Sequence, residues 1–87
     1  MKLERSTKFA KQFAELLQSD PKLAEKIGRI LKNITSDRGL FNFNKGEKLK
    51  YFPNRYSARI DRKNRLIYDR FEDVIVLISC KGHYEDK

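Results

Sequence analysis

The residues best suited to carry out a chemical reaction are one glutamate, two arginines and a His-Tyr pair near the end of the chain. They are Glu47, Arg59, Arg65, His83 and Tyr84. Cleavage of RNA without a metal needs a base for the 2′-hydroxyl proton, cations for the phosphorane, and an acid for the leaving 5′-oxygen. Glu47 can supply the base, the arginines the cations, and His83 the acid, because the unperturbed pKa of histidine is about 6.5. Tyr84 can stack on a base or orient the phosphate.

Each of these residues also fits a plainer interpretation. Glu47 lies among lysines and can belong to an ordinary surface ion pair. The two arginines can pair with Asp61 and Asp69 on the surface of a sheet. A single histidine near a chain end is often only a solvated residue. The residue types alone therefore leave the chemistry open.

The composition indicates a polyanionic partner. The chain has 87 residues, enough for one domain spanning residues 1–87 with one thin core. Its 20 Lys and Arg against 12 Asp and Glu give a net charge of +8, which fits nucleic acid and an acidic protein equally well. Residues 45–65 hold eight cations against two acids. The side chains expected to contact RNA are Lys45, Lys48, Lys50, Arg59 and Lys81.

Cysteine use and the N-terminal sequence indicate a cytoplasmic protein. Cys80 is the only cysteine, so no internal disulfide is possible, and its apolar neighbours predict a buried, inert thiol. The first residues lack an apolar signal core, and no run approaches membrane-spanning length. One histidine, one cysteine and scattered acids offer no ligand cluster, so we expect no metal or other cofactor.

Two helices are expected in the first half of the chain. Apolar residues recur at i, i+4, i+7 and i+8 from Phe9 to Leu17, with Ser6 as the N-cap and an end near Ser19. Asp20-Pro21 marks the start of a second helix, because Asp caps backbone N–H groups and Pro fits the first helical position. The short connection predicts an antiparallel helical hairpin.

Strands are expected in the second half, which predicts an α+β fold. Alternating or apolar runs cover residues 47–52, 56–60, 65–69 and 74–78, and residues 1–5 are either an edge strand or an extended lead-in. Helices followed by strands predict two N-terminal helices packed on one face of a small, mainly antiparallel β-sheet. The residues expected in the core are Phe13, Leu17, Ile27, Ile30, Ile34, Leu66, Tyr68 and Leu77.

Strand parity decides whether the polar residues meet. A two-residue turn at residues 72–73 would pair Arg65 with Cys80. Arg59 shares a face with Arg65 only if the loop between them has an odd number of residues, as in a three-residue turn with a bulge. Gly82 can end the last strand and let the following His-Tyr pair turn back toward Arg65. We expect the five site residues to converge on the face away from the helices.

Four ordered motifs resemble those of a known toxin family. They are Gly46-Glu47-x-Leu49-Lys50, Tyr56-Ser57-x-Arg59-Ile60, Asn64-Arg65-Leu66-Ile67-Tyr68 and Cys80-Lys81-Gly82-His83-Tyr84. With the two-helix N-terminal half, they are similar to the YoeB/Txe branch of the RelE toxin superfamily. Tyr56 stands where the family commonly has Trp, and Asn64 where it commonly has His. The chain also continues past the tyrosine with Glu85-Asp86-Lys87.

The resemblance implies a RelE-like fold and ribosome-dependent cleavage of mRNA by a type II toxin. It places Glu47 at the general base, Arg65 at the phosphate-binding arginine and His83 at the general acid. Tyr84 matches the tyrosine that follows, and Arg59 a supporting arginine. The partners it implies are an acidic, YefM-like antitoxin and the ribosome with its mRNA, while a homodimer stays open.

Two other functional classes remain as alternatives. A ParE-like toxin would share the fold but inhibit a topoisomerase by binding it. A catalytically silent basic module would only pair with a partner. The combination of Glu47, Arg65 and His83 favours the nuclease, because a binding module needs no proton-transfer pair.

Overall fold

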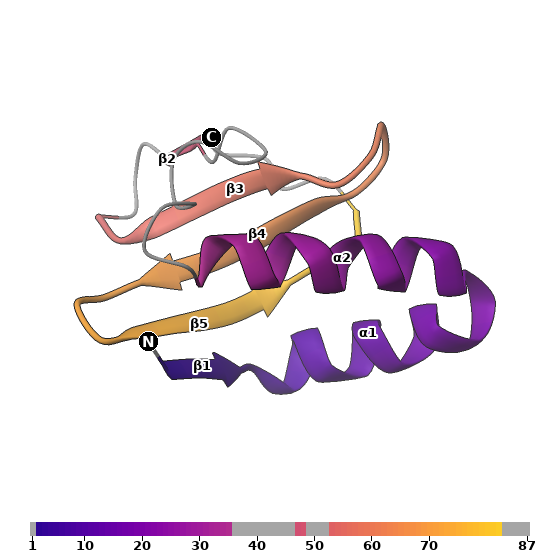
Figure 1. Cartoon of the computed structure of the whole chain (residues 1–87), viewed down its shortest axis with the longest axis horizontal. Helices are drawn as coiled ribbons and strands as arrows, with labels where there is room; N and C mark the ends of the chain where they lie inside the picture. The colour runs from indigo at the N-terminus through magenta and orange to yellow at the C-terminus, as the bar shows by residue number, and fades with distance from the viewer. Residues whose placement is uncertain (1, 36–46, 49–52, 83–87) are drawn as a thin grey trace.

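The sheet has five strands and carries two helices. The computed structural model describes residues 2–35, 47–48 and 53–82. Its elements are β1 (Lys2–Arg5), α1 (Thr7–Ser19), α2 (Pro21–Ile34), β2 (Glu47–Lys48), β3 (Arg55–Arg59), β4 (Arg65–Arg70) and β5 (Val74–Ser79). The strand order is β1-β5-β4-β3-β2, with β1 parallel to β5 and every other pairing antiparallel (Figure 1). The predicted α+β fold is confirmed, and the first residues form an edge strand.

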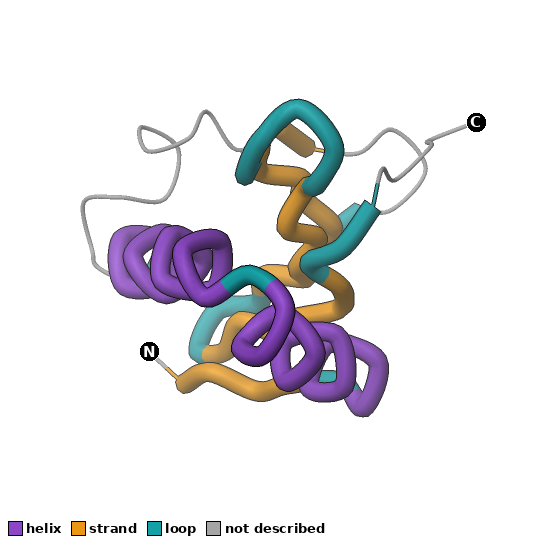
Figure 2. The backbone as a smooth tube through the Cα atoms, turned by 90° about the vertical axis from the view of Figure 1, so that its right-hand side faces the viewer, coloured by secondary structure: helices purple, strands orange, loops and turns teal. Residues whose placement is uncertain are grey.

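Both helices begin at the predicted caps. The Ser6 hydroxyl accepts a hydrogen bond from the Phe9 N–H at 3.0 Å, and the Asp20 carboxylate accepts one from the Leu23 N–H at 3.2 Å. The helices run antiparallel, and Figure 2 shows them beside each other with the sheet extending away. Among the described residues, no helix combines the length and apolar character needed to cross a bilayer.

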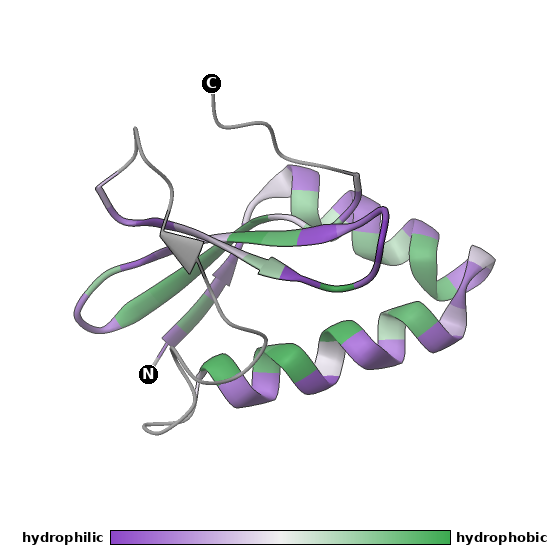
Figure 3. Cartoon of the chain, turned by 90° about the horizontal axis from the view of Figure 1, so that it is seen from above, coloured by the Kyte–Doolittle hydropathy of each residue, from purple (hydrophilic) through white to green (hydrophobic). Residues whose placement is uncertain are grey.

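One core joins the helices to one face of the sheet. Its fully buried members include Phe9, Leu16, Ala24, Ile27, Ile30, Ile34, Ala58, Ile60, Leu66, Tyr68, Ile75, Leu77 and Cys80. The ribbon of α2 is coloured mainly hydrophobic on the side toward the sheet and hydrophilic on the outer side (Figure 3). Phe13 packs against this core but is only partly buried.

The predicted burial of Leu17 is wrong, since this side chain is 54% exposed. The face of α1 that meets the sheet centres on Phe9, Phe13 and Leu16. Each helical residue is rotated by about 100° from the one before it, so Leu17 leaves that face. Apart from the partly buried Phe13, the remaining predicted core residues are buried.

The register of β4 and β5 changes within the ladder. Tyr68 pairs with Leu77, as the predicted two-residue turn requires, but Ile67 pairs with Ser79. Ile78 is therefore an extra residue in β5 and forms a β-bulge. Beyond the bulge, the partner of each β4 residue is shifted by one residue from the predicted partner.

The bulge corrects the predicted pairing of Arg65 with Cys80, which is wrong by one residue. The register beyond the bulge brings Arg65 opposite Lys81, and the Arg65 N–H donates to the Gly82 carbonyl at 3.1 Å. Cys80 is instead buried in the core on the helix side. One inserted residue inverts the faces of a strand, because side chains alternate with a period of two.

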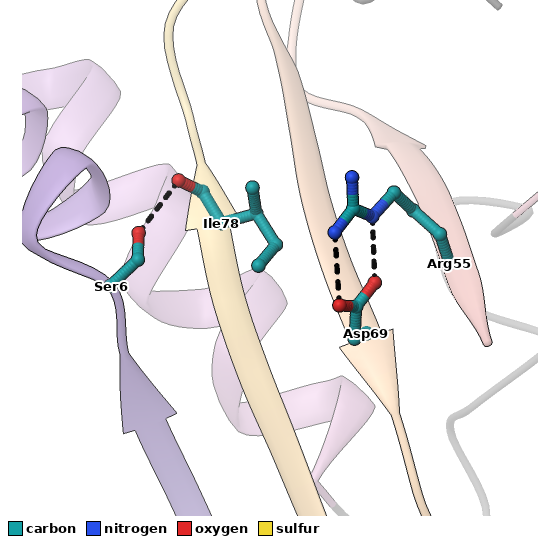
Figure 4. A network of polar contacts seen from close by, with 4 residues as sticks. All are labelled: Ser6, Arg55, Asp69 and Ile78. Atoms are coloured by element: carbon teal, nitrogen blue, oxygen red, sulfur yellow. Dashed lines mark hydrogen bonds and ion pairs between the residues drawn. The ribbon is translucent and has the colours of Figure 1, made fainter. Parts of the chain in front are cut away.

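The start of α1 holds this bulge in place. The Ser6 hydroxyl, besides capping α1, donates to the Ile78 carbonyl at 2.8 Å (Figure 4), and the Ser6 N–H donates to the Leu77 carbonyl at 2.9 Å. Further along, the Cys80 N–H donates to the Gln12 side-chain oxygen at 2.8 Å. Two side chains from the helical half thus fix the path of β5 as it leaves the sheet.

Candidate functional site

The two arginines of the predicted site lie directly opposite each other. Arg59 pairs with Arg65 across β3 and β4, and their neighbours Ala58 and Leu66 belong to the helix-side core. The arginines therefore occupy the face away from the helices. Five residues separate them, an odd number, and the Asn64 carbonyl closes the turn. The prediction that they share a face is confirmed.

A buried serine orients one of these arginines. The Nε–H of Arg65 donates to the hydroxyl of Ser57, which is only 2% exposed. Ser57 lies on β3 two residues before Arg59, so the bond directs the Arg65 side chain diagonally across the ladder toward β3. Ser57 has no role predicted from the sequence, although alternation along the strand already places it on the same face as Arg59.

The edge strand β2 brings a third site residue to this region. Glu47 pairs with Ser57, so its ladder position is on the same face as Arg59 and Arg65. Lys48 pairs with Tyr56, whose ladder position belongs to the opposite face. The register therefore groups the glutamate, and not this lysine, with the arginines.

The last described residues approach the same region from β5. Gly82 has a φ of +84°, a conformation that suits glycine, but β5 already ends at Ser79, earlier than the predicted end at Gly82. Lys81 has its Nζ 4.0 Å from the Glu15 carboxylate on α1, and both side chains are about half exposed. Four predicted site residues, Lys45, Lys50, His83 and Tyr84, lie outside the described residues.

The aspartates that could have neutralised the site arginines bind elsewhere. Asp69 is held by Arg55, with Nε–Oδ1 and Nη2–Oδ2 distances of 2.7 and 3.0 Å (Figure 4). Asp61 accepts from the backbone N–H groups of Lys63 and Asn64 and from the Asn64 side chain. Partial burial opposes ionisation of Asp61, but these bonds outweigh it and hold its pKa below the usual value. The predicted alternative, in which these aspartates pair with Arg59 and Arg65, is wrong.

The thiol of Cys80 is placed as predicted. Burial raises the pKa of Cys80 to about 11, and the nearby Lys81 only partly opposes this shift. A thiol with such a pKa is protonated near neutrality and a poor nucleophile. Within residues 2–35, 47–48 and 53–82, no group of three or more His, Cys, Asp or Glu side chains is arranged to hold a metal ion.

Comparison with known proteins gives the family. The profile described as "YoeB-like toxin of bacterial type II toxin-antitoxin system" matches residues 6–84, which is most of the chain. The comparison with curated protein sequences gave no significant match.

Solved structures agree with this assignment. The YoeB dimer from Staphylococcus aureus is 32% identical with a TM-score of 0.86, covering 97% of this chain and 98% of that one. The YoeB–YefM complex from the same organism is 32% identical with a TM-score of 0.83 and the same coverages. A YoeB/ParE toxin from Agrobacterium tumefaciens is 26% identical with a TM-score of 0.85, covering 97% of this chain and 100% of that one.

The profile covers the helices, the paired arginines and the residues at the end of β5, and the structural likeness extends over nearly the whole chain. The chain therefore belongs to the YoeB-like toxins of bacterial type II toxin–antitoxin systems.

Proposed function

We propose that this toxin is a ribosome-dependent mRNA endoribonuclease, an mRNA interferase, that cleaves RNA through attack by the 2′-oxygen. The observation that carries the proposal is the meeting of four motif segments on the sheet. Arg59 faces Arg65, Glu47 pairs with the serine that binds Arg65, and the residue before His83 accepts a hydrogen bond from the Arg65 backbone. In the proposal, these segments, which are far apart in sequence, supply the base, the cations and the acid.

In the proposed reaction, Glu47 takes the proton of the 2′-hydroxyl as the 2′-oxygen attacks the adjacent phosphorus. Arg65 and Arg59 stabilise the charge that develops on the phosphorane oxygens. His83 gives its proton to the 5′-oxygen as the P–O bond breaks, which leaves a 2′,3′-cyclic phosphate and a 5′-hydroxyl. Tyr84 stacks on a base or orients the phosphate. The reaction needs neither metal nor other cofactor.

Electrostatics would help to hold the message on the basic surface around the site, to which both faces of the sheet edge contribute. The lysines proposed to contact the RNA backbone are Lys45, Lys48, Lys50 and Lys81. Since Lys81 lies near Glu15, its contact with RNA would have to compete with a weak, half-exposed ion pair. The contribution of Lys81 should therefore be the smallest of these and the most sensitive to salt.

An acidic antitoxin of the YefM type is the proposed inhibitor. The net charge of +8 and the YoeB–YefM complex from S. aureus support it, and the S. aureus YoeB dimer supports a homodimer of the free toxin. Association with the antitoxin should be fast and should weaken as salt rises. Binding that is indifferent to salt would point instead to a mainly apolar interface. Action on translating ribosomes places the protein in the cytoplasm.

The proposal is tested by primer extension on mRNA in a translating extract. The wild-type protein should produce new stops within the message, and Arg65→Ala should remove most of them. Arg29→Ala is a matched control, because it deletes the same charge from an exposed position on α2 whose ion pair within the described residues is with Glu25. Equal cleavage by wild type and Arg65→Ala would contradict the assignment of the site.

The alternative is a ParE-like toxin that inhibits a topoisomerase without RNA chemistry. In that case the wild-type protein would arrest growth while the message stayed intact in the same extract. Growth arrest with intact mRNA would therefore replace the nuclease proposal with this one.

A further inference from the structure

A chain of hydrogen bonds links the β3–β4 turn to the end of the described chain. The side-chain oxygen of Asn64 accepts from the Gly82 N–H at 2.8 Å, and its amide nitrogen donates to the two Asp61 carboxylate oxygens at 3.1 and 3.3 Å. An ionised carboxylate can only accept, and a backbone N–H can only donate. The Asn64 amide therefore has one orientation that satisfies both ends.

The Asp61 carboxylate is itself fixed by the turn. It accepts from the backbone N–H groups of Lys63 and Asn64 at 2.8 and 2.7 Å. These bonds favour its ionised form, which is the form that the Asn64 amide needs. Asp61 and Asn64 thus make a rigid support at the tip of the two strands that carry the site arginines.

Gly82 is held from two directions at this support. Its N–H is bound by the Asn64 side chain, and its carbonyl accepts from the Arg65 N–H at 3.1 Å. With φ at +84°, its backbone is left-handed, which glycine adopts at no steric cost. Hydrogen bonds therefore orient both the N–H and the carbonyl of Gly82.

The β-ladder does not itself orient this segment. The last registered pair of β4 and β5 is Ile67 with Ser79, and the next residue, Cys80, gives its N–H to Gln12 on α1. Within the described residues, the bonds that tie residues 81–82 back to the main chain and side chains of β4 and its turn are those of Asn64 and Arg65.

We propose that Asn64 is a positioning residue for RNA cleavage, because it fixes the backbone at Gly82, the residue directly before the proposed general acid. The inference rests on the proposed function, because it assigns Asn64 a role in RNA cleavage. A misplacement of about 1 Å at a reacting group can cost about 100-fold in rate. Loss of this support should therefore lower the rate of the chemical step more than the binding of the message.

The kinetic test is single-turnover cleavage of a message bound to purified ribosomes. Asn64→Ala should lower the maximal rate constant by about 10–100-fold and leave the half-saturating toxin concentration unchanged. Asn54→Ala is the matched control, because Asn54 is exposed and contributes only its backbone carbonyl to a hydrogen bond. This control should keep the wild-type rate.

An exchange of the two side chains sharpens the test. Asn64→Asp keeps an oxygen for the Gly82 N–H but puts two carboxylates in contact, so it should be slow. Adding Asp61→Asn supplies an amide that donates to the new carboxylate at position 64, while its oxygen still accepts from the backbone N–H groups of the turn. The double variant should therefore recover most of the rate. A double variant as slow as Asn64→Asp would contradict a role for the hydrogen bonds from Asp61 through Asn64 to Gly82.

Amide hydrogen exchange of Gly82, followed by NMR, tests the support without using activity. Asn64→Ala should remove the protection of the Gly82 N–H and leave that of core amides such as Leu77 unchanged. The positioning role is overturned if protection is lost while cleavage stays at the wild-type rate, if Gly82 stays protected, or if only half-saturation changes. If the wild-type protein cuts no message, the proposed function fails, and the positioning role fails with it. The exchange data would still show whether Asn64 holds the Gly82 N–H.

Discussion

The two faces of the β3–β4 ladder differ sharply although they are built from alternating residues of the same strands. On the helix side, Ala58 and Leu66 are fully buried in the apolar core. On the other side, their sequence neighbours Arg59 and Arg65 face each other, and Arg65 is tied to Ser57. One face is shaped by packing and the other by directed polar contacts.

The comparison teaches that stability and the proposed chemistry depend on residues one position apart. Because side chains alternate with a period of two, a shift of one residue would bury the arginines and expose the core. The strands therefore position the charges only because their other side is anchored to the helices. Substitutions on the two faces should have separable effects.

The largest effect is expected from His83→Ala. Loss of a positioned proton donor should lower mRNA cleavage by about 10²–10⁴-fold. The substitution lies beyond β5, so the free energy of unfolding should change by less than about 0.5 kcal/mol. Primer extension and thermal unfolding on the same preparation measure both. A variant that still cuts mRNA at the wild-type rate would defeat the assignment of the acid.

The second prediction compares neighbouring residues on opposite faces. Leu66→Ala should cost about 2–5 kcal/mol of unfolding free energy, since Leu66 is fully buried. Arg65→Ala opens no cavity in the apolar core and should cost less than Leu66→Ala, but it should lower cleavage by about 10²–10³-fold. Urea unfolding and cleavage per folded molecule separate the two effects.

Arg65 acts through its permanent charge, so the loss of cleavage in Arg65→Ala should persist at every pH at which the protein is folded. The division between the faces would be broken if Leu66→Ala lowered cleavage per folded molecule as much as Arg65→Ala does.

A smaller effect is expected from Ser6→Ala. This change removes the cap of α1 and the bond from its hydroxyl to Ile78 at the bulge. The expected loss is about 1–2 kcal/mol of unfolding free energy. Ser6→Thr keeps a hydroxyl and is the control, which should retain most of the stability in urea unfolding. Equal losses in the two variants would show that the hydroxyl does not hold the bulge.

The smallest effect is expected from Tyr68→Phe. The Tyr68 hydroxyl is buried and has no hydrogen-bond partner in the described part of the chain, so its removal should change stability by about 0–1 kcal/mol, in the favourable direction. Burial, and then the neighbouring Tyr56, raise the pKa of Tyr68 to about 12 from 10.0. The wild-type protein should therefore lose stability as pH rises from about 10 to about 12, because the unfolded chain releases this proton first.

Tyr68→Phe lacks that proton, so its advantage over wild type in unfolding free energy should grow over the same pH range. The raised pKa of Cys80 affects both proteins equally and cancels in the comparison. A variant less stable than wild type at neutral pH would show that the hydroxyl makes a favourable contact.

Much of the fold followed from local patterns in the sequence. Three correctly predicted features depend on neighbouring residues. They are the caps at Ser6 and Asp20, the two-residue turn between β4 and β5, and the loop with an odd number of residues between the arginines. Alternation in the strands then assigned Arg59 and Arg65 to one face. These features are local, so spacing alone can reveal them.

The errors came from contacts between distant parts of the chain. The bulge at Ile78 is held by Ser6, which lies 72 residues away in sequence, and it shifted the predicted pairing of Arg65 with Cys80 by one residue. The support of Gly82 by Asn64 spans 18 residues and was not predicted. Asp69 had Arg59 and Arg65 as candidate partners, and its actual partner is a third arginine, Arg55, directly opposite on β3.

The central claim is that the face bearing Arg59 and Arg65 cleaves mRNA through the 2′-oxygen. The most direct test compares two messages in ribosome complexes, identical except for a single 2′-deoxynucleotide at the position where the wild-type protein cuts. We predict a primer-extension stop on the ribose message and none at that position on the deoxy message, because the attacking oxygen is absent. Equal cleavage of both messages would contradict the account.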